Sequence, residues 1–165
     1  MKINIKSNKG VTITGLVIYV ISFFMICAVI GVITTFFNNN TKVLSSEATA
    51  SAEYDILNAY LAKEAKTEGN TVREVNNSTV ERTENGTSVN YAIEKMKFSN
   101  GNEYIFEKKV DAEYGQIYLY NTVTKKYFVV ANYIQSATFF QITDGFKVEI
   151  KILEKTYTQT YNLAD

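Results

Sequence analysis

The sequence has no histidine, no proline and no tryptophan, and its single cysteine, Cys27, lies inside a long apolar run. A lone cysteine excludes a disulfide within the chain. Without histidine, the usual zinc sites, thiol–imidazole pairs and Ser–His–Asp triads cannot be built. The acidic residues form no cluster of the convergent oxygens that calcium requires. We therefore expect no enzymatic activity, no metal and no cofactor.

Charge is scarce near the N-terminus. No charged residue occurs from Gly10 to Thr41, and the first ten residues carry three lysines and no acid: Lys2, Lys6 and Lys9. The chain has 17 basic and 17 acidic residues, so a chain starting at Val11 would keep 14 basic residues and carry a net charge of −3. Lysines before an apolar segment orient it with the N-terminus in the cytoplasm.

The apolar run from Val11 to Phe37 is 27 residues long. As a helix it would measure about 40 Å, against a bilayer hydrocarbon core of about 30 Å. A cleavable secretory signal has a shorter apolar core of about 7–15 residues. Its candidate cleavage site here, Ala48-Thr49-Ala50, also lies far beyond the run. We therefore predict a single transmembrane helix over residues 11–37, with everything after it outside the cytoplasm.

The residues around the start of this run form a motif, Asn8-Lys9-Gly10-Val11-Thr12-Ile13. It resembles the N-terminus of type IV pilin-like and pseudopilin precursors, in which a short basic leader ends in glycine before a long apolar helix. The resemblance implies cleavage by a prepilin peptidase between Gly10 and Val11, and N-methylation of Val11. Residues 1–10, with Lys2, Lys6 and Lys9, would be the leader. Glycine has no side chain, so the backbone there can lie extended in a peptidase cleft.

One position differs from the family pattern. Most members have a glutamate at the fifth mature position, where it pairs with the N-terminal amine of a neighbouring subunit, and here that position is Gly15. A carboxylate at that depth is costly unless it is paired. Its replacement implies a minor subunit, not the major one. The expected order of one long helix followed by an antiparallel sheet is what resembles minor pilins of the competence or type II secretion class.

Residues 38–68 are predicted to continue the helix with an apolar stripe facing a sheet. The stripe has spacings of mostly three or four and comprises Leu44, Ala48, Ala50, Tyr54, Leu57 and Leu61, widened by Ile56 and Tyr60. Charged residues are expected on the opposite side: Glu47, Glu53, Asp55, Lys63, Glu64 and Lys66. Gly69-Asn70 is a helix stop. Because Asn38–Asn40 weakens the helix, a transmembrane helix, a loop and a separate second helix remain the alternative.

The remaining residues, 69–165, are expected to form a globular antiparallel β domain, within which the polar stretch 67–90 is a connecting loop with at most short strands. Strands are predicted over Tyr91–Phe98, Glu103–Lys108, Gln116–Tyr120, Lys126–Ala131, Ala137–Ile142, Phe146–Leu153 and Thr156–Leu163. Asn100-Gly101 and Asp144-Gly145 favour tight turns. The fold class is therefore α+β, a long N-terminal helix packed on an antiparallel sheet. The resemblance implies the pilin-like fold.

These features predict a structural minor pilin or pseudopilin, assembled into a type IV pilus-like filament for secretion, DNA uptake or adhesion. Its partners would be the prepilin peptidase, other pilins, the polytopic assembly platform protein and the membrane. It would reside in the cytoplasmic membrane and then in a pilus or pseudopilus at the cell surface. Nucleic acid is not an expected partner, although Lys108-Lys109 and Lys125-Lys126 beside tyrosines could contact DNA at a filament tip. The alternative is an uncleaved, signal-anchored extracellular binding domain that does not polymerise.

Overall fold

A computed structural model describes residues 9–164, with side chains from Ile13 onward. In this range the chain forms one helix and seven strands: α1 (Lys9–Lys66), β1 (Val72–Glu84), β2 (Thr87–Phe98), β3 (Asn102–Lys109), β4 (Gly115–Asn121), β5 (Lys126–Ile142), β6 (Gly145–Ile152) and β7 (Lys155–Asn162). The chain divides into two compact units, Met1–Leu44 and Ser45–Asp165. We describe each unit by itself.

The predicted α+β class is confirmed. The seven strands form one antiparallel sheet in chain order, each strand pairing with the next. Helix α1 continues through Asn38–Asn40 and ends at Lys66, so the alternative of a loop between two helices is wrong. The sheet begins at Val72, after the turn at residues 67–71.

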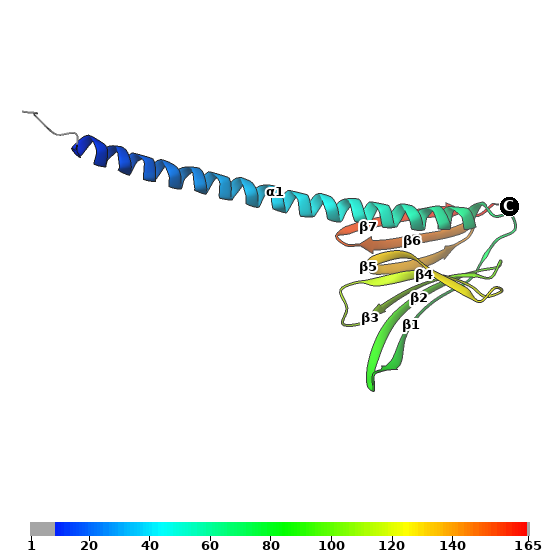
Figure 1. Ribbon diagram of the computed structural model, residues 1–165. Coiled ribbons are helices and arrows are strands. Elements are labelled where there is room, and N and C mark those ends of the chain that lie inside the picture. The colour runs from blue at the N-terminus through cyan, green and yellow to red at the C-terminus, as the bar shows by residue number, and fades with distance from the viewer. Residues whose placement is uncertain (1–8, 165) are drawn as a thin grey trace, which may run out of the picture. The chain divides into compact units, whose positions relative to one another are not determined.

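The second unit buries one stripe of α1 against the sheet, as predicted, but over a shorter length. Its fully buried members are Ala50, Leu57, Leu61 and Ala65. Tyr54 and Tyr60 pack on the edge of the same core, whereas Ile56 is 50 % exposed and does not widen it. Figure 1 shows this part of α1 alongside β7 and β6, which explains why burial begins only near Ala50.

The loop expected over residues 67–90 is wrong, because β1 and β2 form a long hairpin there. Its turn is Asn85-Gly86, where φ is 49° and 80°. Two consecutive positive φ angles are the signature of the type I′ turn that suits tight hairpins. Most side chains of β1 are exposed, so this edge strand shows no apolar alternation, and its pairing comes from the backbone of β2. The sequence signal for this hairpin was Asn85-Gly86, which was not interpreted as a turn when the strands were predicted.

Strand β5 is one element of 17 residues where two strands were predicted. Its first half pairs with β4 and its second half with β6, and the register shifts between residues 129 and 136. At this change Tyr133 has a φ of 57°, and its carbonyl accepts a hydrogen bond of 3.0 Å from the Leu153 amide. The bend turns the second half of β5 towards the first hairpin, where the Gln141 side chain donates to the Val72 carbonyl.

The interior of the sheet is regular in β6, where apolar residues alternate with Lys147, Glu149 and Lys151. Such alternation predicts one buried face, and its apolar members are buried: Phe146, Val148, Ile150 and Ile152. The role of the glycine before them differs from the prediction. Ile142 pairs with Gly145, so the turn itself is residues 143–144. A side chain at Gly145 would collide with the carbonyl oxygen of Tyr161, so glycine allows the close approach of β7.

Candidate functional sites

Among the described residues of the first unit, the apolar part of α1 has no packing partner. Every Val, Ile, Leu, Met, Phe and Tyr from Ile13 to Phe37 is at least 46 % exposed. Such a surface is strongly unfavourable in water, because each Å² of apolar area left exposed forgoes about 25 cal/mol. By length and composition, this helix could cross a membrane. It therefore requires an apolar environment, either lipid or other helices.

Polar groups in this segment are compatible with that environment. The Thr35 hydroxyl donates to the Gly31 carbonyl at 2.9 Å, so the helix itself satisfies it. At Gly15 an added Cβ would have open space, with nothing within 4 Å among the described residues. The first unit therefore supplies no internal reason for a glycine at this position.

The residues of the implied processing site lie at the edge of the described range. Lys2 and Lys6 are outside it. Lys9, Gly10 and Val11 belong to the first turn of α1, and their side chains are outside the described residues. The peptide bond that a prepilin peptidase is predicted to cut, between Gly10 and Val11, thus lies at the N-terminus of α1.

The most buried charged group among the described residues of the second unit is Glu64, only 4 % exposed. Its Oε1 accepts hydrogen bonds from Asn102 Nδ2 at 2.6 Å and the Tyr104 hydroxyl at 3.3 Å. Its Oε2 accepts from Asn100 Nδ2 at 2.6 Å and Asn70 Nδ2 at 3.0 Å. Burial, followed by the nearby Glu64 carboxylate, raises the pKa of Tyr104 well above its usual value. Four neutral donors thus replace water around one carboxylate and tie the last turns of α1 to the β2–β3 turn.

This cluster corrects the sequence prediction, which placed Glu64 on the exposed side of the helix. Glu64 follows Leu61 by three residues and Leu57 by seven, so helical geometry places it on the flank of the buried stripe. The signal that could have found it is the Asn-rich turn around Gly101, whose amides are suitable donors. The four contacts are all with neutral side chains, and no group of three or more His, Cys, Asp or Glu able to hold a metal occurs in the described range. We interpret the cluster as structural.

Glu53, also predicted on the outward face, holds the bend of β5. Its Oε2 accepts a hydrogen bond of 2.7 Å from the backbone amide of Asn132, the residue before Tyr133. The next residue, Tyr54, stacks on Tyr157 of β7 with ring centroids 4.1 Å apart. Both contacts fix the helix to strands distant in the sequence.

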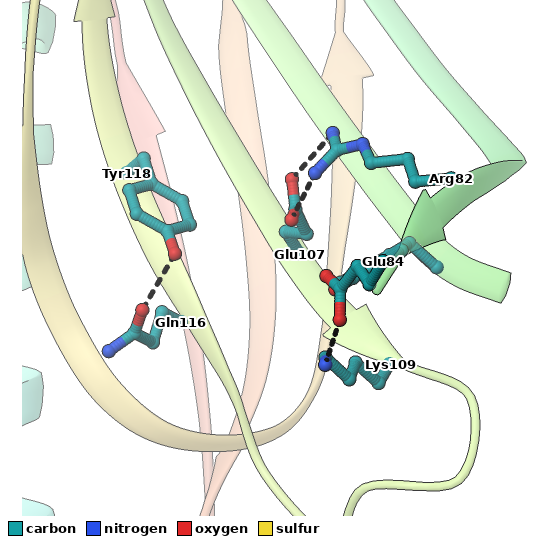
Figure 2. Close-up of polar contacts among 7 residues, drawn as sticks. Arg82, Glu84, Glu107, Lys109, Gln116 and Tyr118 are labelled. Carbon is teal, nitrogen blue, oxygen red and sulfur yellow. Dashed lines mark hydrogen bonds and ion pairs between the residues drawn. The ribbon is translucent and has the colours of Figure 1, made fainter. Parts of the chain in front are cut away.

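The face of the sheet that carries Tyr118 holds a network of paired charges and tyrosines (Figure 2). Arg82 of β1 donates to both carboxylate oxygens of Glu107 on β3, at 2.6 and 3.0 Å. The Lys109 ammonium donates to Glu84 at 2.5 Å. The Tyr91 hydroxyl also donates to Glu84, and the hydrogen bonds from Lys109 and Tyr91 lower the pKa of that carboxyl. Each charge in this network thus has an opposite partner.

A cavity of about 560 Å³ opens beside this network, where the end of β3, the start of β4 and the bend of β5 meet. Four tyrosines line it, Tyr91, Tyr114, Tyr118 and Tyr133, together with the amide side chains of Gln116 and Asn132. Its lining includes Lys108 and Lys109 but neither Lys125 nor Lys126, so it does not unite the two lysine pairs considered for DNA contact. No local sequence pattern singles out this set, because its members come from four strands, β2 to β5, and from the turn between β3 and β4.

The comparisons with known proteins add no assignment: no family model, no curated protein and no solved structure matches this chain. The resemblance to prepilins therefore rests on the N-terminal motif alone.

Proposed function

We propose that this protein is a minor pilin or pseudopilin, cut between Gly10 and Val11 and assembled into a type IV pilus-like filament. The observation that carries the proposal is the contrast within α1. Its large apolar side chains from Ile13 to Phe37 are exposed all round, whereas one stripe from Ala50 to Ala65 packs on a sheet. A subunit that moves from a bilayer into a bundle of sister helices needs such a helix.

Cleavage would convert a membrane anchor into an assembly helix. Removal of residues 1–10 takes away Lys2, Lys6 and Lys9, which otherwise hold the N-terminus at the cytoplasmic surface. The new end at Val11 is apolar apart from its amine. In a filament, neighbouring helices would replace the lipid around residues 13–37. Gly15 offers no carboxylate to the amine of a neighbour, which favours a minor position over the repeating shaft.

The assembly would involve the prepilin peptidase, other pilins and a polytopic platform protein. Before assembly, the protein would sit in the cytoplasmic membrane with residues 1–10 inside and the sheet outside. After assembly, the sheet would be exposed at the cell surface, and the filament would serve secretion, DNA uptake or adhesion.

The intact mass and N-terminal sequence of the protein from its native membrane test this proposal. We expect a chain that begins with N-methylated Val11. A Gly10→Val variant should keep residues 1–10, because a branched side chain obstructs the extended backbone at the cut. A Gly15→Ala variant is the matched control and should be processed normally. A wild-type chain that still carries residues 1–10 would contradict the proposal.

The second candidate is an uncleaved, signal-anchored binding domain that does not polymerise. The cavity between β3, β4 and β5 favours it, since such a site could act without a filament. Retention of residues 1–10 together with a monomeric state in the membrane would support this candidate over the first.

A further inference from the structure

The cavity lined by Tyr91, Tyr114, Tyr118 and Tyr133 has features that the fold itself does not require. The bend of β5 needs a residue with positive φ, and Tyr133 has a φ of 57°. Glycine or asparagine adopts that conformation with less strain than a bulky aromatic residue. The Tyr133 side chain is 48 % exposed, so it contributes little to the core. A strained, exposed aromatic residue at the rim of a cavity points to a role in binding.

The aromatic wall continues from Tyr133 to Tyr114. Their rings meet edge to face, with centroids 6.2 Å apart and planes at 82°. This contact holds the Tyr133 ring at the mouth of the cavity. An aromatic face carries partial negative charge and attracts the weakly positive C–H groups of a flat ligand.

The polar groups of the cavity are fixed in direction. The Tyr118 hydroxyl donates to Gln116 Oε1 at 2.6 Å, as Figure 2 shows, and Gln116 Nε2 donates to Asn132 Oδ1 at 2.8 Å. An amide nitrogen carries two N–H groups, so Gln116 keeps a second donor for a ligand. The chain of bonds from Tyr118 to Asn132 orients that donor before any ligand arrives.

The charges around the cavity do not favour a polyanion. Glu107 is bound by Arg82 and Lys109 is bound by Glu84, so these charges compensate each other, and Lys108 is the one further charged residue of the lining. Nucleic-acid sites instead collect unpaired lysines and arginines along a groove. A neutral ligand with hydroxyl groups and an apolar face fits the lining better.

We propose that this cavity binds a saccharide, with a sugar ring against Tyr133 and Tyr114 and its hydroxyl groups on Gln116 and Asn132. The volume of about 560 Å³ lies within the range of small-ligand sites, about 300–1,000 Å³. This site goes beyond the proposed role as a filament subunit, because it would act on a processed or an unprocessed chain alike. On a filament it would present a glycan-binding surface outward.

Calorimetric titration of the full chain tests the proposal. The protein should be held in a zwitterionic detergent, since a sugar-headed detergent would compete for the site. The probes are trisaccharides of glucose, mannose and N-acetylglucosamine, with an oligothymidine as the nucleic-acid probe. We expect at least one trisaccharide to bind and the oligothymidine not to bind.

Two cavity variants and one matched control locate the site. Tyr133→Gly should weaken saccharide binding about tenfold or more, the scale expected when one aromatic anchor is removed. Its thermal midpoint should stay equal or rise, because glycine relieves the positive φ. Gln116→Leu should weaken binding through loss of the amide donor. Tyr127→Ala removes a ring that is 71 % exposed on the same hairpin but outside this cavity, and should leave binding unchanged.

The opposite results would overturn the proposal. These are binding of none of the trisaccharides, unchanged affinity in Tyr133→Gly, or an equal loss in Tyr127→Ala. Binding of the oligothymidine at this cavity in place of a saccharide would also overturn it and would identify a nucleic-acid site.

Discussion

The two parts of α1 belong to one continuous helix, yet they are suited to different surroundings. From Ile13 to Phe37 the apolar side chains occupy every face and are all exposed within the chain. From Ala50 to Ala65 they occupy one stripe, and the sheet buries it. A helix that is apolar all round needs an apolar environment on all sides, whereas a striped helix needs one covering layer. The difference shows that the distribution of apolar residues, not helix propensity, assigns each part its environment.

The polar groups of the two parts differ in the same way. In the first part the Thr35 hydroxyl is satisfied by its own helix, which leaves the surface free for lipid or helices. In the second part Glu53 and Glu64 accept hydrogen bonds from the sheet. Burial of the second part therefore depends on partners far away in the sequence.

The largest expected effect tests this contrast directly. Leu57→Ala removes a side chain with no exposed surface and should lower the free energy of unfolding of the second unit by about 2–5 kcal/mol. Ile30→Ala, at a side chain 57 % exposed, should change it by less than about 0.5 kcal/mol. Urea unfolding in a zwitterionic detergent, followed by the circular dichroism of the sheet, measures both. Equal losses would show that the two parts are not energetically distinct.

A smaller effect is expected at the buried carboxylate. Glu64→Gln places an NH₂ group among the amide and hydroxyl donors that now point at a carboxylate, leaving at least one donor unpaired. The unfolding free energy should fall by about 1–3 kcal/mol. Glu68→Gln is the control at an exposed glutamate near the same helix end. If both variants had the same midpoint of urea unfolding, Glu64 would not be the anchor we infer.

Acid should act on the second unit alone, since residues 1–44 contain no Asp, Glu or His, the side chains that titrate in acid. Burial of Glu103 opposes its charged form, but hydrogen bonds from Lys97 and Lys95 outweigh burial and lower its pKa. A carboxyl whose folded pKa is depressed stabilises the fold above its unfolded pKa, near 4.5, and loses that contribution as pH falls through the folded pKa. Unfolding free energy should therefore decline from about pH 5 to about pH 3.

The variant Glu103→Gln provides the control for this pH dependence. It should be less stable than the wild type at neutral pH and should lose less stability in acid, as measured by urea unfolding at each pH. Parallel curves for the two proteins would rule out Glu103 as a source of the acid sensitivity.

The smallest expected effect lies at the boundary between the two parts. Asn39→Ala replaces a weaker helix former with the strongest one and should stabilise the helix there by about 0.5 kcal/mol. Amide hydrogen exchange near residues 38–42 should slow about twofold, while exchange in the sheet should not change. Faster exchange in the variant would show that Asn39 makes a stabilising contact we have not recognised.

The elements with a regular pattern were predictable from the sequence. The charge-free run predicted α1, and the alternation from Phe146 to Ile152 predicted the buried face of β6. Both predictions were possible because the spacing of apolar residues in a helix or a strand can be seen within a short stretch of sequence. Strand β1 was missed because an edge strand with exposed side chains needs no apolar pattern. The continuity of β5 was missed because its middle is held by a bend at Tyr133 that no local rule favours.

The candidate sites divide along the same line. The motif around Gly10 and Val11 consists of consecutive residues, so the sequence by itself was enough to find it. The composition and length of the apolar run that follows were likewise enough to predict the helix. Glu64 has four donors spread from Asn70 to Tyr104, and the tyrosine cavity joins residues of β2, β3, β4 and β5. Only the tertiary structure could reveal these two sites. The distances between their residues depend on how the strands pair and bend, and the order of residues along the chain does not contain that information.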